Sequence, residues 1–147
     1  PLFINGFTVL KKQNEIDSSK NFKDELILNN TTTDWNPTTG ASETEITVFS
    51  LKQGSQISRA VSTSELNIYR YTVMAQCKEQ STFTMQINWH GSNGFLSAEI
   101  IQRSCNQIKQ RTSFDTVAPS GTSYSVLYLS VPQDVELTAS NFSFRKK

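Results

Sequence analysis

Aromatic and hydrogen-bonding side chains recur at alternate positions in three segments rich in β-forming residues, 67–78, 81–90 and 123–131. Because side chains two residues apart on a strand share one face, such residues can gather on the outside of a sheet. Sugars present apolar C–H faces and a rim of hydroxyls, which aromatic rings and amide or guanidinium groups can bind. The sequence therefore predicts a saccharide-binding surface made of Tyr124, Tyr128, Arg70, Gln76, Gln86, Asn88 and His90.

Some of these residues also have an interpretation that needs no ligand. Strand-forming tyrosines such as Tyr124 and Tyr128 pack across neighbouring strands on any half-exposed sheet. A lone histidine such as His90 is usually a polar residue of the surface. Both interpretations stay open on the sequence alone.

Residue patterns typical of enzymes are scarce. His90 is the only histidine and no G-x-S-x-G motif is present, so a Ser-His-Asp relay is not expected. A glycosidase needs two carboxylates about 5 to 10 Å apart, and Glu99 and Asp115 fall in neighbouring expected strands. Two surface acids are the simpler interpretation of that pair. We predict no catalytic residues and no metal site, because glycine-rich phosphate loops and metal-ligand clusters are also missing.

Length and charge narrow the classes of partner. A chain of 147 residues fits one domain, and 14 Lys and Arg against 13 Asp and Glu leave a net charge of +1. No strong field is available to attract nucleic acid or anionic lipid. No run approaches the roughly 18 apolar residues of a membrane span. We therefore expect no nucleic-acid partner and no membrane insertion, and the first and last residues favour a C-terminal domain of a longer protein.

Two cysteines, Cys77 and Cys105, are too few for a disulfide scaffold. One disulfide between them remains open. Cys77 falls within an apolar strand pattern, where cysteine behaves as a small hydrophobic residue. Free thiols are therefore the favoured interpretation.

Short segments rich in Val, Ile, Thr, Tyr and Phe alternate with turn residues, whereas helical periodicity is nearly absent. This pattern predicts an all-β fold, a two-sheet antiparallel β-sandwich. Residues 1–24 would form an N-terminal arm or linker and residues 25–147 the sandwich. The expected strands are 3–10, 25–29, 44–51, 55–62, 67–78, 81–90, 94–103, 107–117, 123–131 and 135–145.

Alternation also assigns the faces of three strands. In 67–78 the apolar side begins at Tyr69 and Tyr71, and in 81–90 it includes Phe83 and Trp89. In 123–131 an inward row of Leu127, Leu129 and Val131 leaves Tyr124 and Tyr128 outside. Both tryptophans, Trp35 and Trp89, are expected in the core.

Several motifs resemble, in their order and spacing, carbohydrate-binding modules of the galactose-binding-like jelly-roll superfamily, especially families 4 and 9. They are LILN at 26–29, Trp35, YTVMA at 71–75, INW at 87–89, Gly94, Phe114, APSGT at 118–122 and NFSF at 141–144. The chain is also rich in Asn, Ser and Thr, and in this it resembles baseplate accessory domains of lactococcal-type siphophages. That resemblance implies a jelly roll on a virion, in the tail baseplate, with other baseplate or tail proteins as partners.

One departure from the family concerns calcium. Similar modules often hold a structural calcium ion with acidic residues near the first and last strands. Here Asn30 and Thr31 follow the first motif, and Ser140 and Asn141 stand in place of the acidic pair. Calcium prefers several oxygen ligands with negative charge among them, so we expect no cofactor and regard a bound calcium as doubtful.

Together these features favour a non-catalytic carbohydrate-binding domain. The resemblance implies that it acts outside the cell, in host recognition, by attaching a virion to the cell-wall polysaccharide of its host. The first alternative is a structural or docking sandwich of the baseplate with no glycan ligand. The second and weaker alternative is a glycoside hydrolase that uses Glu99 and Asp115.

Overall fold

Alternating apolar residues produce long strands that are buried on one side and reach solvent on the other. The computed structural model describes residues 25–147. In its two central strands, β6 (Ile68–Cys77) and β7 (Ser81–Gly91), buried residues alternate with residues that reach solvent. The predicted phase of both strands is confirmed. The buried side chains are Tyr69, Tyr71, Val73, Ala75 and Cys77 on β6, and Phe83, Met85, Ile87 and Trp89 on β7.

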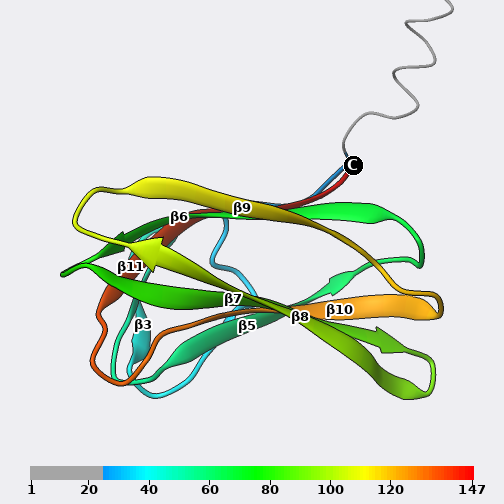
Figure 1. Cartoon of the computed structure of the whole chain (residues 1–147), viewed down its shortest axis with the longest axis horizontal. Coiled ribbons are helices and arrows are strands. Elements are labelled where there is room, and N and C mark those ends of the chain that lie inside the picture. The colour runs from blue at the N-terminus through cyan, green and yellow to red at the C-terminus, as the bar shows by residue number, and fades with distance from the viewer. Residues whose placement is uncertain (1–24) are drawn as a thin grey trace, which may run out of the picture.

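These strands belong to two antiparallel sheets that pack face to face, so the predicted β-sandwich is confirmed (Figure 1). Sheet A has the order β3-β4-β11-β6-β9, and β1 also pairs with β11. Its other strands are β1 (Glu25–Asn29), β3 (Ala41–Glu45), β4 (Val48–Leu51), β9 (Gln110–Val117) and β11 (Leu137–Lys146). Sheet B has the order β2-β5-β10-β7-β8. Its other strands are β2 (Asn36–Pro37), β5 (Gln56–Ser62), β8 (Gly94–Cys105) and β10 (Thr122–Ser130).

Within residues 25–147 we find no helix with the length and apolar character needed to cross a membrane.

A bulge in β11 lets two strands share one of its edges. Ser140 and Ser143 are both paired with β6, but the register shifts at the two residues between them. Asn141 adopts a positive φ of 53°, a conformation that asparagine tolerates better than most residues. The extra residue turns Phe142 into the core, where its ring centroid lies 4.8 Å from that of Trp35. As a result β4 pairs before the bulge and β1 pairs after it.

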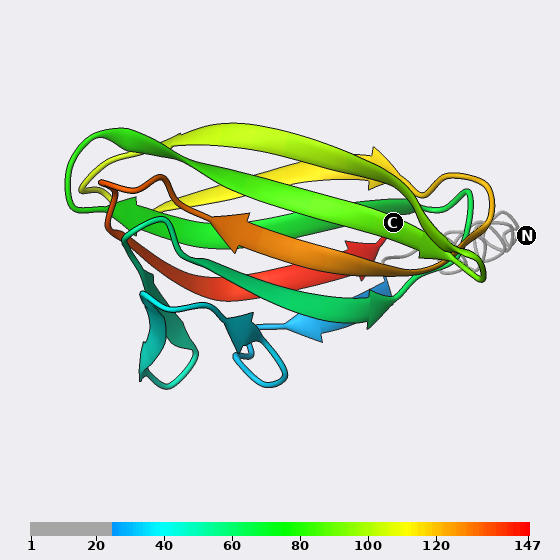
Figure 2. The same cartoon turned by 90° about the horizontal axis from the view of Figure 1, so that it is seen from below.

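Most expected strands are confirmed, with one clear correction. The segment predicted as a single strand at 44–51 is a hairpin of β3 and β4, with Thr47 at a φ of 65° in its turn. Figure 2 shows this hairpin, in cyan, beside the long strands. The short strand β2 was not expected. The expected strand 3–10, and the arm 1–24 that contains it, lie outside the described residues.

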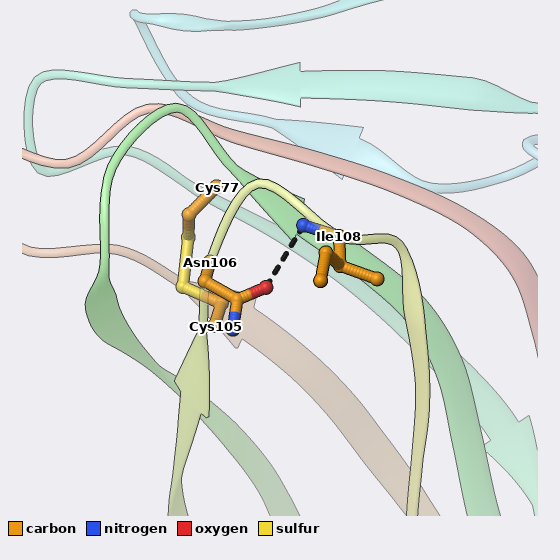
Figure 3. Close-up of a disulfide and its surroundings, with 4 residues drawn as sticks. All are labelled: Cys77, Cys105, Asn106 and Ile108. Carbon is orange, nitrogen blue, oxygen red and sulfur yellow. Dashed lines mark hydrogen bonds between the residues drawn. A yellow bond between two sulfur atoms is a disulfide. The ribbon is translucent and has the colours of Figure 1, made fainter.

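The expectation of free thiols is wrong, because Cys77 and Cys105 form a disulfide (Figure 3). Cys77 ends β6 of sheet A and Cys105 ends β8 of sheet B, and both side chains are buried. Their Cα atoms lie 5.4 Å apart, within the usual range for a disulfide. The bond therefore links the two sheets at one end of the sandwich. Close by, the Asn106 side chain accepts a hydrogen bond from the Ile108 amide at 2.8 Å.

Both tryptophans are in the core, as predicted. Trp35 is 5% exposed, and its indole N–H donates to the carbonyl of Thr31 at 3.1 Å. Trp89 is 2% exposed and packs against Tyr69 of the opposite sheet, with ring centroids 6.1 Å apart. Neither ring is available as a platform for a sugar.

Candidate functional site

The outer face of sheet B brings together five of the seven predicted site residues. On β10, Tyr124 and Tyr128 point outward, as the strand phase predicted, while Leu127 and Leu129 are fully buried. Pairing with β7 places Tyr124 beside His90 and Tyr128 beside Gln86. Asn88 lies between them, opposite Val126. These residues form a continuous outer surface, which we call the aromatic face.

One end of the aromatic face is a cluster of three rings. The rings of His90 and Tyr124 are stacked, with centroids 4.8 Å apart and planes within 6°. Phe95, across the β7–β8 hairpin, meets His90 edge-on at 5.7 Å. Tyr124 is 41% exposed and Phe95 is 59% exposed, so ring surface remains open to a ligand. Phe95 was missed at the sequence level, although its place directly after Gly94, across the turn from His90, is a usable signal.

The other half of the aromatic face carries amides. Gln86 donates its side-chain N–H to the side-chain oxygen of Asn88 at 2.7 Å. This bond orients both amides, and it leaves the Gln86 oxygen as an acceptor and the Asn88 nitrogen as a donor for further hydrogen bonds. A ring platform with oriented amides beside it can hold the apolar face of a sugar and some of its hydroxyls.

Two predicted site residues, Arg70 and Gln76, do not join this face. Both point outward as expected, but β6 lies in sheet A, on the opposite side of the sandwich. Arg70 forms two hydrogen bonds with Asp115, at 2.7 and 3.1 Å. Gln76 donates to the carbonyl of Gln107 at 2.7 Å. The structure therefore separates the seven predicted residues into two groups.

A hydrogen bond through the core anchors Tyr128. The hydroxyl of Tyr71, which is fully buried, donates to the Tyr128 carbonyl at 3.2 Å and so connects sheet A to sheet B. Burial raises the pKa of Tyr71 well above its ordinary value, so the hydroxyl remains protonated and a donor.

We expect Tyr71→Phe to lower the free energy of unfolding by about 1 kcal/mol, the net value of one such hydrogen bond. Urea denaturation followed by circular dichroism measures the change. Tyr124→Phe is the matched control, because that ring is half exposed, and we expect it to stay within about 0.5 kcal/mol of the parent. Equal stability of Tyr71→Phe and the parent chain would show that the bond contributes nothing.

The carboxylates of the hydrolase alternative do not face each other. Asp115 and Thr116 are adjacent on β9 and point to opposite sides of sheet A. Thr116 donates to Glu99 on the inner side, whereas Asp115 pairs with Arg70 on the outer side. The hydrogen bond from Arg70 also holds the pKa of Asp115 below its usual value, whereas a general acid needs a raised pKa. This geometry does not support acid catalysis across a sugar ring.

Of the four residues that stand in place of a calcium site, Ser140 and Asn141 lie on β11 of sheet A, and Asn30 and Thr31 directly follow β1. Asn30 and Asn141 line the same groove on the outer face of sheet A. Between residues 25 and 147, no three side chains of the types His, Cys, Asp and Glu come close enough together to hold a metal ion. The donors near Asn30 and Asn141 are amides and hydroxyls, which lack the negative charge that calcium prefers.

The fold that these two sheets define is the jelly-roll sandwich of carbohydrate-binding modules. The xylan-binding CBM22-1 domain of Paenibacillus barcinonensis Xyn10C is similar with a TM-score of 0.63 at 10% identity, over 83% of this chain and 94% of that one. A CBM4 structure is similar with a TM-score of 0.62 at 9% identity, over 84% and 95%. The enzymatically active domain of bacteriophage CBA120 tailspike protein 4 is similar with a TM-score of 0.62 at 10% identity, over 78% of this chain and 20% of that one.

Neither a protein-family model nor a curated protein sequence matches this chain. At these identities, the likeness to solved structures establishes the fold alone.

Proposed function

We propose that this chain is a non-catalytic saccharide-binding domain and that the aromatic face of sheet B is its binding surface. The single observation that carries the proposal is the stacked pair of His90 and Tyr124 beside the hydrogen-bonded amides of Gln86 and Asn88. Structural likeness to a xylan-binding module and a family 4 module supports this class of ligand. The separation of Glu99 from Asp115 supports a role without catalysis.

Binding to immobilised glycans tests the proposal. We expect Tyr124→Ala to weaken binding about tenfold, equal to about 1.4 kcal/mol, because the ring loses its stacking contact with the sugar. Tyr128→Ala should weaken binding in the same direction. Xylohexaose, galactotriose and purified Gram-positive cell-wall polysaccharide are suitable ligands, with affinity measured by titration calorimetry or on a glycan array.

Ile108→Ala is the control for this experiment, because Ile108 is 66% exposed and lies in the loop between β8 and β9. We expect its affinity to match that of the parent chain. Unchanged binding in both tyrosine variants would contradict the proposed site. No binding of the parent chain to any glycan would contradict the function itself.

We further propose that the domain belongs to a phage virion, in the tail baseplate, and helps it attach to host cell-wall polysaccharide. Three observations support this role: the resemblance of the sequence to siphophage baseplate modules, the fold shared with a phage tailspike domain, and the disulfide between Cys77 and Cys105, which suits an oxidising environment outside cells. Many copies on one particle would make weak single sites sufficient for firm attachment. Labelling of intact Gram-positive cells, compared with cells stripped of wall polysaccharide, tests this role.

Docking to other baseplate or tail proteins is a second candidate function. Ile68 and Val117 are cross-strand neighbours on the outer side of sheet A, and they are 46% and 56% exposed. Leu66, whose amide donates to Ala118, adds a side chain that is 67% exposed. Exposed apolar neighbours of this kind favour contact with another protein. Absence of labelling on every host surface, together with assembly onto other tail proteins, would favour docking.

A further inference from the structure

Strand β8 ends the order of sheet B, and among residues 25–147 it pairs only with β7. Its twelve residues make it the longest of the described strands, and most of its side chains are exposed. Ile100, at its centre, is 61% exposed. A long exposed strand at the end of a sheet presents backbone N–H and C=O groups that can pair with a further strand. We call this side of the strand the β8 edge.

The other strands that end the order of a sheet are protected against such pairing. Strand β2 has only two residues, one of them Pro37, and the five residues of β3 include Glu43 and Glu45. Strand β9 carries the exposed charged side chains of Arg111 and Asp115. Short length, proline and exposed charges are usual protections of a sheet edge. Strand β8 contains no proline and no lysine, and beyond one irregularity near its start its register with β7 is regular.

The middle of β8 is complementary to itself. Residues 99–103 read EIIQR. If two copies pair as antiparallel strands about a two-fold axis at Ile101, the two Ile101 side chains lie opposite each other. Glu99 of each copy then lies opposite Arg103 of the other, an arrangement that stabilises a strand pair. The two Ile100 side chains become diagonal neighbours on the outer face, about 7 to 8 Å apart and within contact range.

Both charged groups keep the capacity to form this pair. In the single copy, Thr116 donates a hydrogen bond to Glu99, and Arg103 donates one to the carbonyl of Ser113. These partners are neutral, so they hold the two side chains without cancelling their charges. A carboxylate accepts several hydrogen bonds and a guanidinium has five N–H donors, so each group can form further bonds. Both side chains are half-buried, which limits the screening of an ion pair by solvent.

Neighbouring positions of the axis fit less well. An axis at Glu99 puts the two carboxylates opposite each other, and an axis at Arg103 does the same with the two guanidinium groups. An axis at Ile100 or Gln102 puts a charged side chain opposite Ile101. Like charges directly opposite each other destabilise a strand pair. The side chains therefore select the axis at Ile101.

We propose that the β8 edge joins two copies of this chain into a symmetric dimer. Backbone hydrogen bonds and the isoleucine contacts supply most of the affinity, and the two ion pairs fix the register. The two five-stranded sheets B become one continuous sheet. Because the axis is perpendicular to that sheet, both aromatic faces lie on the same side. A polysaccharide that bound one face would then meet the second at a raised effective concentration. The dimer itself requires no saccharide, so it goes beyond the proposed function.

Sedimentation equilibrium of the whole chain tests the dimer. We expect the parent chain to be largely dimeric at about 0.1 mM, and Arg103→Glu to weaken association about tenfold or more. That substitution puts like charges opposite each other twice, once on each side of the axis. Glu99→Arg combined with Arg103→Glu restores both ion pairs in the opposite sense and should return association towards the parent level. Ile100→Lys changes a side chain that is exposed in the single copy, and it should also weaken association.

The matched control is Lys52→Glu, which makes the same change of charge at an exposed residue directly after β4. It should leave association near the parent level. Tyr124→Ala should do the same, so the dimer and the saccharide site are tested separately. Circular dichroism shows that each variant is folded. A parent chain that is monomeric at about 0.1 mM would overturn the proposal. Equal association of the parent, Arg103→Glu and Ile100→Lys would also overturn it, as would a charge-swapped variant no better than Arg103→Glu.

Discussion

Reduction of the disulfide between Cys77 and Cys105 should lower the free energy of unfolding by about 3 to 4 kcal/mol. The two cysteines are 28 residues apart, and the bond joins the end of β6 in sheet A to the end of β8 in sheet B. In the reduced chain these ends separate freely on unfolding, so the denatured state gains entropy. The sandwich also loses its one covalent link between sheets among the described residues. Urea denaturation with and without a thiol reductant measures the difference.

The chain provides a clean control, because Cys77 and Cys105 are its only cysteines. Reduced parent chain keeps every core atom, so it isolates the crosslink from packing. The double variant Cys77→Ala and Cys105→Ala should be destabilised by at least as much, and reductant should have no further effect on it. Identical urea midpoints for oxidised and reduced parent chain would show that the crosslink adds no stability.

Local periodicity made the faces of single strands predictable from the sequence. Alternation along 67–78, 81–90 and 123–131 identified which residues are buried, including Trp89, and left Tyr124 and Tyr128 outside. The reason is geometric, since the two sides of a strand are fixed by its own backbone. The stacked partner of Tyr124 was among the predicted residues for the same reason, because His90 has the outward phase on β7.

Sheet membership was not predictable in the same way, because it depends on contacts far apart in sequence. Arg70 and Gln76 have the correct phase, but β6 pairs with β11 and β9 and so faces away from β10. The disulfide was not predicted for the same reason, because it also depends on which strands are neighbours. Cys77 and Cys105 end strands of different sheets, and only the packing of those sheets brings their Cα atoms within 5.4 Å.

Among substitutions of residues on or directly beneath the aromatic face, we expect Trp89→Ala to lower the free energy of unfolding the most. The indole itself lies in the core. The ring is 2% exposed and packs against Tyr69 of sheet A. Replacing a buried aromatic residue with alanine leaves a cavity, and we expect the free energy of unfolding to fall by about 3 to 5 kcal/mol. Urea denaturation followed by circular dichroism is the measurement, since the substitution removes a fluorophore.

The same substitution tests how the core supports the binding surface. Trp89 lies between Asn88 and His90 on β7, so a collapse of the strand into the cavity would move both outward side chains. We therefore expect weaker saccharide binding even where the variant is fully folded. Phe95→Ala is the control for stability, because that ring is 59% exposed and should change the free energy of unfolding by only about 0.5 kcal/mol. Similar stability losses in the two variants would contradict the assignment of Trp89 to the core, and undiminished binding in folded Trp89→Ala would show that the aromatic face does not depend on it.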